Sequence, residues 1–554
     1  MEPMAAITCL NHLSTYNIAP MGNFGRLRTQ SSGPKFLEKQ ERLHVAGCGS
    51  ASREPFVPET RDTRSIARTK EEVDYSEKVV RRVVKKFSKW QPMPKSEEFE
   101  RRDISVPRVP GTSLRGWGDG GSNHNVIYKS AENVTKWKKF PADNAFFSRK
   151  SFREVGCDDN IIESLRAQQI LHPSHIQALA FAPVLERKSC IIGDQSGSGK
   201  TLAYLLPVLQ RLRQEELQGI DKSLPENPRV VILVPTAELA RQVLSSCRSI
   251  SKFGVPFRSM VATGGFRQRT QLDSLKQNLD VLIATPGRFM FLMSEGLLHL
   301  ANLRCIVLDE VDILYNIEEY GPLFQSLVNS APVAVQYLFV TATLPMEVCN
   351  KLIEVFPDCK MIMGPGMHRT SSNLEEVLID CSGDDGTDKT PETAFQNKKH
   401  ALLQLVEERP VTKTIVFCNK IETCRKVENI LNRLDRKGIR NRVLPFHAAL
   451  TQEVRVANMQ EFCTSQSKDK SLFLVCTDRA SRGIDFNGVD HVILFDFPHD
   501  PSEYVRRVGR TARGAGTKGR AFLFVVGKQV SLARRIIERN RKGHPVHDVP
   551  PPYA

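Results

Sequence analysis

The stretch SCIIGDQSGSGKTLAYLLPVLQRL, residues 189–212, indicates how the central part of this chain folds. An apolar strand at 190–192 leads into a glycine-rich turn, and a helical segment follows at 202–212. Glycines let backbone N–H groups surround phosphates at a helix N-terminus, where the helix dipole also favours an anion. This order of strand, turn and helix therefore predicts a phosphate-binding loop, in which Lys200 reaches the outer phosphates and the Thr201 hydroxyl binds Mg²⁺.

Two acidic residues further along the chain would complete a phosphate-transfer site. Asp309 and Glu310 directly follow an apolar strand at 305–308. In an open parallel sheet, the carboxyl ends of the strands border the ligand crevice. We therefore expect Asp309 to hold Mg²⁺ through water, and Glu310 to orient and deprotonate the attacking water.

From residue 150 onward, short apolar strands alternate with helical segments, which is typical of parallel sheets with helices on both faces. A polar break at 382–393 divides this alternation into two units. The expected strands lie at 190–192, 230–234, 281–284, 305–308 and 337–340 in the first unit, and at 414–418, 443–446, 472–476 and 492–494 in the second.

The chain has 554 residues, with 78 Lys and Arg against 62 Asp and Glu, and the resulting net charge of +16 predicts an anionic partner. Residues 1–150 hold 27 of the basic and 17 of the acidic residues, so most of the excess lies there. Within 79–87, four valines and a phenylalanine share one helical face, opposite Arg and Lys residues at 81, 82, 85 and 86. Such a helix either contacts a partner or RNA phosphates, or packs against the body as a solvated helix.

Residues 3–37 contain no Asp or Glu but several basic and hydroxyl residues, the composition of an organellar transit peptide. An ordinary terminal tail is the alternative interpretation. The 13 cysteines lie singly and without metal-ligand spacing, which favours a reducing compartment over a disulfide scaffold or zinc module. No apolar run approaches the roughly 18 residues that a membrane helix needs, so we exclude a membrane-spanning protein.

The order of motifs across residues 152–513 resembles that of the DEAD-box ATP-dependent RNA helicases. Phe152 precedes PSHIQ (173–177), and the phosphate loop, PTAELA (235–240), GG (264–265), TPGR (285–288), DEVD (309–312) and TAT (341–343) follow in that order. The second unit continues the match with IVFCN (415–419), TDRASRGID (477–485) and YVRRVGRTAR (504–513).

The resemblance implies an α/β fold of two tandem RecA-like domains, each a parallel sheet with helices on both faces, preceded by a largely disordered N-terminal extension. We expect a transit-peptide-like segment at 1–50, a charged, flexible extension at 51–148, an ATP-binding domain at 149–375, a linker at 376–396 and a C-terminal helicase domain at 397–554.

The resemblance also implies ATP and Mg²⁺ as cofactors, with Mg²⁺ held at Thr201 and Asp309. The amide of Gln177 can donate and accept at once, which suits the adenine edge. The implied catalytic residues are Lys200, Asp309, Glu310 and two arginines that reach the γ-phosphate, Arg510 and Arg513. The implied ATP-binding residues are Phe152, Gln177, Asp194, Gln195, Ser196, Gly197, Ser198, Gly199, Lys200, Thr201 and Asp485. Those implied in RNA binding are Thr236, Gly264, Gly265, Thr285, Arg288 and Thr477, and those in coupling are Asp312, Thr341, Thr343 and Arg506.

Several residues depart from the family's pattern. Asp194 replaces the usual Ala at the head of the phosphate loop, where a carboxylate repels phosphates unless it points away. Ala237 replaces an Arg that supports RNA contact, and Arg506 replaces a His that couples the nucleotide site to the rest of the protein. Ser196 also replaces Thr in the phosphate loop, and milder departures are Val311 for Ala and Ala512 for Gly.

Together these features predict an ATP-dependent RNA helicase that opens short RNA duplexes through contacts that read no sequence. The alternative is a weakly hydrolysing RNA clamp or chaperone, whereas the PSHIQ segment and the TPGR loop disfavour a DNA translocase. With its transit-like N-terminus, the chain resembles plastid helicases of plants that act in ribosomal RNA maturation, and the mitochondrion is the alternative location. Ribonucleoprotein partners would bind through the basic extension.

Overall fold

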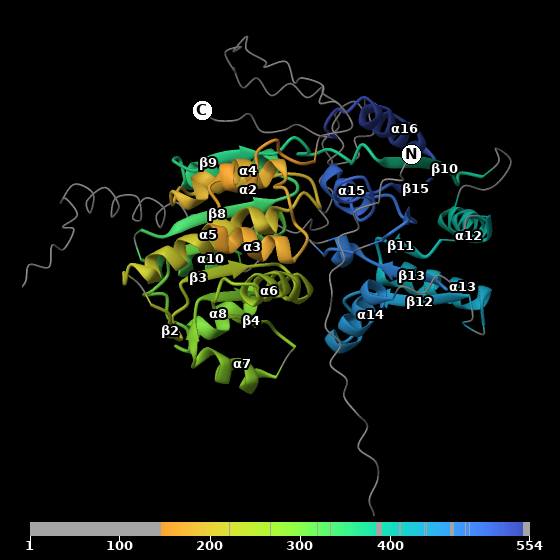
Figure 1. Ribbon diagram of the computed structural model, residues 1–554. Helices are drawn as coiled ribbons and strands as arrows, with labels where there is room; N and C mark the ends of the chain where they lie inside the picture. Colours follow the sequence, from red (N-terminus) through yellow and green to blue (C-terminus); the bar gives the residue numbers. More distant parts are fainter. Residues whose placement is uncertain are drawn as a thin grey trace, which may run out of the picture. The chain divides into compact units, whose positions relative to one another are not determined.

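The computed structural model describes residues 146–220, 222–265, 267–317, 320–332, 334–383, 390–408, 411–436, 438, 440–465, 470–481, 484–486 and 488–546. The transit-like segment, nearly all of the charged extension and the helix expected at 79–87 lie outside these residues. The described residues form a first lobe (146–363) and a second lobe (374–546), which are joined by a connector at 364–373 (Figure 1).

The first lobe is built on a seven-stranded sheet in the order β4-β6-β3-β7-β8-β1-β9, in which all neighbours are parallel. Alternate strand residues enter two cores, with Ile191 and Val231 in one and Ile192 and Ile232 in the other, because side chains on a strand point to opposite faces. The strands are β1 (Cys190–Gly193), β3 (Val230–Leu233), β4 (Ser259–Ala262), β6 (Val281–Ala284), β7 (Cys305–Asp309), β8 (Gln336–Thr341) and β9 (Lys360–Met363), with a separate antiparallel pair of β2 (Leu224–Pro225) and β5 (Asn278–Leu279).

Two groups of helices cover the two faces of this sheet. Helices α2 to α6 contribute to the core that contains Ile192, and α7 to α11 contribute to the core that contains Ile191. Their bounds are α2 (Phe152–Val155), α3 (Asp159–Ala167), α4 (His175–Leu185), α5 (Lys200–Leu217), α6 (Ala237–Lys252), α7 (Gln268–Leu275), α8 (Pro286–Ser294), α9 (Val311–Tyr315), α10 (Tyr320–Ser330) and α11 (Met346–Val355).

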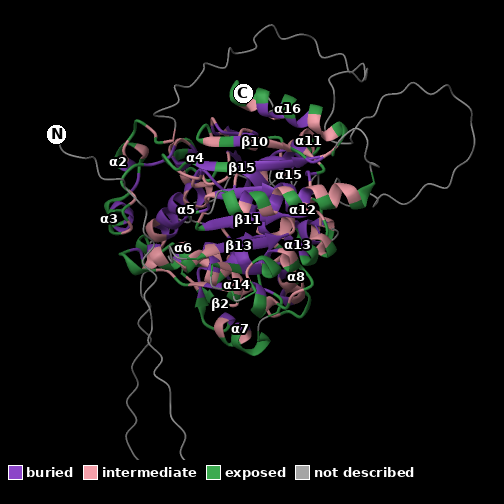
Figure 2. Ribbon diagram, turned by 90° about the vertical axis from the view of Figure 1, so that its right-hand side faces the viewer, coloured by how far each residue is buried: buried purple, intermediate pink, exposed green. Residues whose placement is uncertain are grey.

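The second lobe repeats this plan with a six-stranded sheet in the order β10-β15-β14-β11-β13-β12, again parallel throughout. Figure 2 shows its central strands buried, whereas α12 and α16 expose their outer sides. The strands are β10 (Leu374–Asp380), β11 (Lys413–Phe417), β12 (Asn441–Phe446), β13 (Ser471–Cys476), β14 (His491–Leu494) and β15 (Gly519–Val525). The helices are α12 (Pro391–Glu408), α13 (Ile421–Leu434), α14 (Gln452–Thr464), α15 (Pro501–Val508) and α16 (Lys528–Arg541), with a short 3₁₀ turn η1 (Asp478–Ser481).

The two parallel α/β units confirm the predicted fold class. All nine expected strands are present, and their ends differ from the expected ones by at most two residues. Among the described residues, no helix combines the length and the apolar character needed to cross a bilayer.

The chain passes from one sheet to the other earlier than the sequence predicts. β10 pairs with β15 of the second sheet, with Leu374 opposite Gly519, so the linker expected at 376–396 contains most of a strand and the start of α12. The sequence of β10, LEEVLID, is not an apolar run because this strand lies at the sheet edge and is only partly buried. The connector therefore consists of residues 364–373.

Candidate active site

The phosphate loop follows β1 and ends where α5 begins. Gly197 and Gly199 adopt left-handed φ angles of 81° and 87°, which glycine accepts without strain. A Cβ on Gly199 would lie 2.4 Å from the Gln177 side-chain nitrogen, so a larger residue would displace Gln177 as well as strain the backbone. The Lys200 ammonium donates to the carbonyl oxygens of Asp194 and Gln195, both at 2.8 Å. Burial lowers the pKa of Lys200, and the opposing charge of Glu310 is the largest factor that favours its ammonium form.

The acidic pair lies beside this loop because β7, β8 and β1 are consecutive in the sheet. Asp309 accepts hydrogen bonds from the Tyr204 hydroxyl at 3.1 Å and from the Glu310 N–H at 3.0 Å. Burial raises the pKa of Asp309. Glu310 has a φ of 55°, a left-handed conformation that costs roughly 1–2 kcal/mol for a residue with a Cβ. Such strain is typical of functional positions.

The carboxylate of Glu310 is buried, and its Oε2 receives no hydrogen bond from the described residues. Burial, followed by the negative charges of Asp312 and Asp309, raises the pKa of Glu310 to about 7. A carboxyl with a pKa near neutral can accept a proton efficiently, which suits a general base.

The residues present fit a nucleotide-bound Mg²⁺. The charges that act most strongly on Lys200 are three carboxylates, those of Glu310, Asp194 and Asp309. In the described part of the chain, no group of three or more His, Cys, Asp or Glu side chains is arranged to hold a metal. Mg²⁺ in nucleotide sites commonly uses one or two protein groups together with phosphate oxygens. Asp309 and Thr201 would be those two groups.

The DEVD and TAT segments form one hydrogen-bonded cluster with an arginine of the second lobe. Asp312 accepts from the hydroxyls of Thr341 at 2.8 Å and Thr343 at 2.5 Å. Arg506 donates to Asp312 at 2.8 Å and to the Thr343 hydroxyl oxygen at 3.0 Å. Burial opposes the charge of Arg506, but the surrounding acids, led by Asp312, raise its pKa overall. The residue that replaces the usual His therefore forms an ion pair with the DEVD motif.

Two further arginines of the YVRRVGRTAR segment, Arg510 and Arg513, reach the phosphate loop. Arg510 donates to the Ser196 hydroxyl oxygen at 2.8 Å and to the Ile484 carbonyl at 2.5 Å. Burial and then the charge of Arg513 lower the pKa of Arg510 to about 9, which leaves it charged at neutral pH. Arg513 pairs with Asp485 at 3.2 Å, and a Cβ on Gly197 would lie 3.0 Å from its Nε atom.

Of the residues assigned to ATP at the start of the first lobe, Gln177 lies next to the phosphate loop. Phe152 is buried in the core of this lobe. Gln177 forms a reciprocal cap with Ser174 at the start of α4, and its amide nitrogen donates to the Gly199 carbonyl at 3.2 Å. The Gln177 side chain therefore ties the PSHIQ segment to the phosphate loop.

The first-lobe loops assigned to RNA lie side by side, because β4, β6 and β3 are neighbours at one side of the sheet. Thr236 follows β3 and caps α6, and Thr285 follows β6 and precedes α8. Gly264 follows β4 and has open space where a Cβ would be. Arg288 stacks on Phe291, with 4.8 Å from the guanidinium carbon to the ring centre. Thr477 follows β13 in the second lobe and is half-buried.

A second row of contacts between the lobes was not predicted from the sequence. Glu238 of the first lobe pairs with Arg455 at 3.0 Å and with Arg479 at 3.6 Å, and its side chain is fully buried. The Asp485 N–H donates to the Gln242 side-chain oxygen at 2.7 Å. Gly265 lies against Gln452, where an added Cβ would come within 1.8 Å of the side-chain oxygen.

Comparisons with known proteins agree with this geometry. Residues 174–352 match the DEAD/DEAH box helicase family, and residues 397–515 match the helicase conserved C-terminal domain. DEAD-box ATP-dependent RNA helicase 50 of Oryza sativa subsp. japonica is 64% identical over 449 residues, which cover 81% of this chain and 69% of the rice protein. The chain belongs to the DEAD-box RNA helicase family.

Other similar proteins extend this result. DEAD-box ATP-dependent RNA helicase 50 of Arabidopsis thaliana is 67% identical over 447 residues, which cover 80% of this chain but only 57% of that protein. This DEAD-box chain thus spans little more than half the length of its Arabidopsis relative. Among solved structures, S. cerevisiae Dbp5 bound to RNA and ADP BeF3 has a TM-score of 0.59 and 25% identity, covering 71% of this chain and 93% of that one.

Two departures from the DEAD-box pattern have local structural consequences. The Asp194 carboxylate accepts a hydrogen bond from the Gly366 N–H at 2.9 Å, so it points toward the connector. Ala512, which replaces a glycine, has a left-handed φ of 51°. The first departure creates a new contact, and the second places a strained residue between Arg510 and Arg513.

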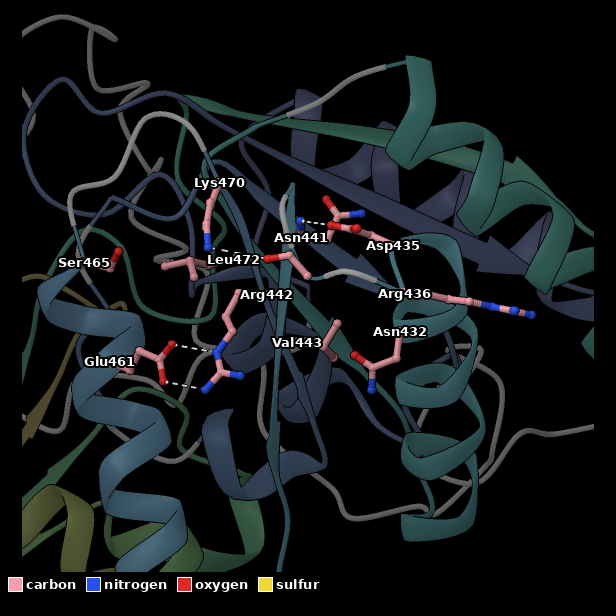
Figure 3. A pocket seen from close by; sticks show the side chains of 11 residues that line it. Asn432, Asp435, Arg436, Asn441, Arg442, Val443, Glu461, Ser465, Lys470 and Leu472 are labelled. Atoms are coloured by element: carbon pink, nitrogen blue, oxygen red, sulfur yellow. Dashed lines mark hydrogen bonds and ion pairs between the residues drawn. The ribbon is translucent and has the colours of Figure 1, made fainter.

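A groove of about 620 Å³ lies on the second lobe of this DEAD-box chain, next to the edge strand β12 (Figure 3). Arg442 on β12 faces Glu461 on α14 across it and forms two hydrogen bonds, at 2.7 and 3.1 Å. None of the predicted site residues lines this groove. Its arginine is already neutralised by a carboxylate, so we assign the groove no part in nucleotide chemistry.

Proposed function

We propose that this chain is an RNA-stimulated ATPase that uses ATP hydrolysis to separate short RNA duplexes. The observation that carries the proposal is the contact of Arg510 with Ser196, which brings a second-lobe arginine onto the phosphate loop of the first lobe. A site shared by two lobes hydrolyses ATP only when they close, and RNA that spans both lobes would promote closure. Dbp5, a protein of similar structure, has been seen bound to RNA and ADP BeF3.

Each polar residue of the site has a distinct task in this proposal. Lys200 would exchange its two carbonyl partners for phosphate oxygens, and ionised Glu310 would accept the proton of the attacking water. Arg510 and Arg513 would stabilise the charge that develops on the transferred phosphoryl group. Mg²⁺, bound with ATP at Thr201 and Asp309, would neutralise part of the phosphate charge.

RNA would lie along the loops after β3, β6 and β4. Their hydroxyl and backbone groups can contact sugars and phosphates, and such contacts position a strand without reading its bases. Discrimination of RNA from DNA would then depend on 2′-hydroxyl contacts. Closure of the lobes would bend one strand away from its complement.

The experiment is to measure ATP hydrolysis with and without single-stranded RNA, and strand separation of a short RNA duplex. Glu310→Gln is the matched control, because it should keep nucleotide binding while it stops hydrolysis. Hydrolysis that RNA does not stimulate, or stimulation without strand separation, would favour the weakly hydrolysing clamp. GTP should not replace ATP, and comparable rates with GTP would remove Gln177 from adenine selection.

The orientation of the Asp194 carboxylate weakens one argument for the clamp alternative. A carboxylate aimed at the phosphates would weaken ATP binding, but this one accepts hydrogen bonds from the Gly366 and Gln195 N–H groups, both at 2.9 Å. It is also almost fully buried. ATP binding thus remains compatible with Asp194.

We further infer that the chain acts in RNA maturation, specifically ribosomal RNA maturation, in the plastid. Two observations support this location: the acid-poor composition of residues 3–37, and the plant origin of the two similar helicases from rice and Arabidopsis. A fluorescent fusion to residues 1–60 should enter plastids. Uptake by mitochondria would move the proposal to that organelle, and cytosolic fluorescence would overturn it.

The basic extension would supply extra RNA or ribonucleoprotein contacts. Reversing the four charges at 81, 82, 85 and 86 to Glu should flatten the salt dependence of RNA binding, because each phosphate contact contributes roughly 0.7 to 0.9 log units of affinity per log unit of salt. An unchanged slope would assign this helix to the body of the protein.

A further inference from the structure

The first residues of the connector, Gly364 to His368, are fitted closely to the phosphate loop. The Gly364 N–H donates to the Gly193 carbonyl at 2.7 Å, and the Gly366 N–H donates to the Asp194 carboxylate at 2.9 Å. A Cβ on Gly364 would lie 2.3 Å from the Asp194 carboxyl carbon, and one on Gly366 would lie 2.6 Å from the Gln195 side chain. A side chain at either glycine position would therefore displace the loop residue that it meets.

The same segment also contacts the loop that follows β8. His368 is fully buried, and its Nε2 accepts a hydrogen bond from the Leu344 N–H at 2.7 Å. Leu344 directly follows the TAT segment, whose two threonines bind Asp312. The His368 carbonyl accepts from the Val546 N–H of the second lobe at 2.8 Å. Five consecutive connector residues thus link the phosphate loop, the TAT segment and the second lobe.

Lys200 and Asp194 both hydrogen-bond to the same stretch of backbone. Lys200 donates to the carbonyls of Asp194 and Gln195, while the Asp194 carboxylate accepts from the Gln195 and Gly366 N–H groups. When Lys200 turns toward phosphates, these carbonyls lose their donor and the peptide between the two residues is free to reorient. Asp194 is 3% exposed, packed against Gly364 and bonded to the Gly366 N–H, so the connector would follow such a movement.

We propose that Asp194 is a positioning residue that transmits occupancy of the phosphate loop to the connector and so promotes closure of the second lobe. This inference rests on the proposed ATPase function and adds a route of regulation to it. The alanine usual in the family has no side-chain acceptor for the Gly366 N–H. We therefore expect this coupling only in chains that have an acidic residue at position 194. The carboxylate acts through Gly366 and touches neither the reacting water nor the leaving group.

The test compares Asp194→Ala, Asp194→Asn and Gly364→Ala in the full chain. Asn keeps an acceptor oxygen for the Gly366 N–H, Ala removes it, and Gly364→Ala keeps the carboxylate but forces it away. Fluorophores at two exposed positions, Leu217 and Glu538, report the distance between the lobes. The probes are a non-hydrolysable ATP analogue with single-stranded RNA for closure, and ATP with saturating RNA for turnover.

We expect Asp194→Ala and Gly364→Ala to need about tenfold more analogue for half-maximal closure, and to lose about tenfold in kcat with a smaller change in the KM for ATP. Asp194→Asn should recover most of both values. Equal losses in the Ala and Asn variants, or closure of Asp194→Ala at the wild-type analogue concentration, would overturn the inference. If Asp194→Ala does not fold, as judged by thermal unfolding, the Asn variant and Gly364→Ala decide the matter.

The failure of this inference can be told apart from failure of the proposed function. If the wild-type protein and the Asp194→Ala variant both close and hydrolyse ATP with RNA, only the role of Asp194 is excluded. A wild-type protein that neither closes nor hydrolyses ATP removes the proposed function, and this inference with it.

Discussion

The two rows of contacts between the lobes differ in where their negative charge comes from. In the row beside the phosphate loop, the phosphate row, Arg506 and Arg513 pair with Asp312 and Asp485. Arg510 reaches the Ser196 hydroxyl and forms no ion pair with an acid among the described residues, although the charges of Glu310 and Asp485 favour its charged form. In the row that contains Glu238, the RNA-side row, one first-lobe carboxylate serves both Arg455 and Arg479. The phosphate row thus has an arginine whose charge a phosphate could match. The RNA-side row supplies its own anion.

This difference predicts which row of contacts should become more stable when nucleotide binds. A buried arginine without an anion is unfavourable until a phosphate arrives, so the phosphate row gains stability when ATP binds. A buried ion pair within the protein is already complete and gains nothing from the ligand. The two rows should therefore respond differently to single substitutions.

Removing Arg510 should have the largest effect. Arg510→Ala should lower the RNA-stimulated kcat by about 10³-fold or more, because arginine fingers contribute that much in related phosphoryl-transfer enzymes. Arg510→Lys keeps a charge without the planar fork and should recover little of the rate. Steady-state ATP hydrolysis at saturating RNA measures both. A loss below about tenfold would remove the distinction between the two rows.

Breaking the RNA-side row should have the next largest effect, with or without nucleotide. Glu238→Gln leaves the buried Arg455 and the partly exposed Arg479 without their shared carboxylate. Removing one partner of a buried pair costs about 3–5 kcal/mol, and the Glu238–Arg455 pair is of this kind. The radius of gyration of the ligand-free protein should increase. Glu461→Gln, which breaks the exposed Arg442 pair, is the control, and it should change stability by at most about 1 kcal/mol. An opening that appears only with nucleotide would contradict the comparison.

Restoring the family's histidine should give the phosphate row a pH dependence. The acids around Arg506 raise its pKa despite burial, so the wild-type arginine stays charged at neutral and moderately alkaline pH. A histidine has an ordinary pKa of about 6.5, which Asp312 would raise. Its charged form is present below that pKa and is lost as the pH rises.

In Arg506→His, kcat relative to wild type should therefore fall by up to about tenfold as the pH rises from roughly 6 to 8. Arg506→Lys keeps the charge and should follow the wild-type profile. Parallel profiles for the histidine variant and the wild type would mean that the charge of residue 506 does not matter.

Ala512→Gly should have the smallest effect. Ala512 has a left-handed φ of 51°, and relief of this conformation should stabilise the second lobe by about 1 kcal/mol or less, since glycine also gains entropy in the unfolded chain. Chemical denaturation measures the difference. A loss of stability would mean that the Ala512 methyl group packs well enough to outweigh the strain.

Much of this fold could be predicted because its central strands are continuous apolar runs. Val230–Leu233 and Val281–Ala284 are buried on both faces, and this burial is what the sequence pattern records. β10 was missed because an edge strand keeps acidic residues, such as Glu375, on its exposed side. The position of the connector could not be predicted without this strand.

The site was predicted where its residues are local in sequence. The phosphate loop and the Asp309–Glu310 pair follow from spacing within single segments. Tyr204 carried a usable signal, since it lies one helical turn after Lys200 and so shares its face of α5. Glu238 and His368 carried none, because their partners, Arg455 and Leu344, are distant in sequence and only the folded chain brings them together.

The pairing of β10 with β15 has a consequence for the order in which the chain folds during synthesis. β10 is the first strand of the second sheet to leave the ribosome, yet it pairs only with β15, the last strand to be made. Until β15 emerges, the hydrogen-bonding edges of β10 have no native partner, and an unpaired edge promotes aggregation. The acidic residues of β10 lower that risk. The same acidic residues that made the strand hard to predict therefore protect it from aggregation until β15 is synthesised.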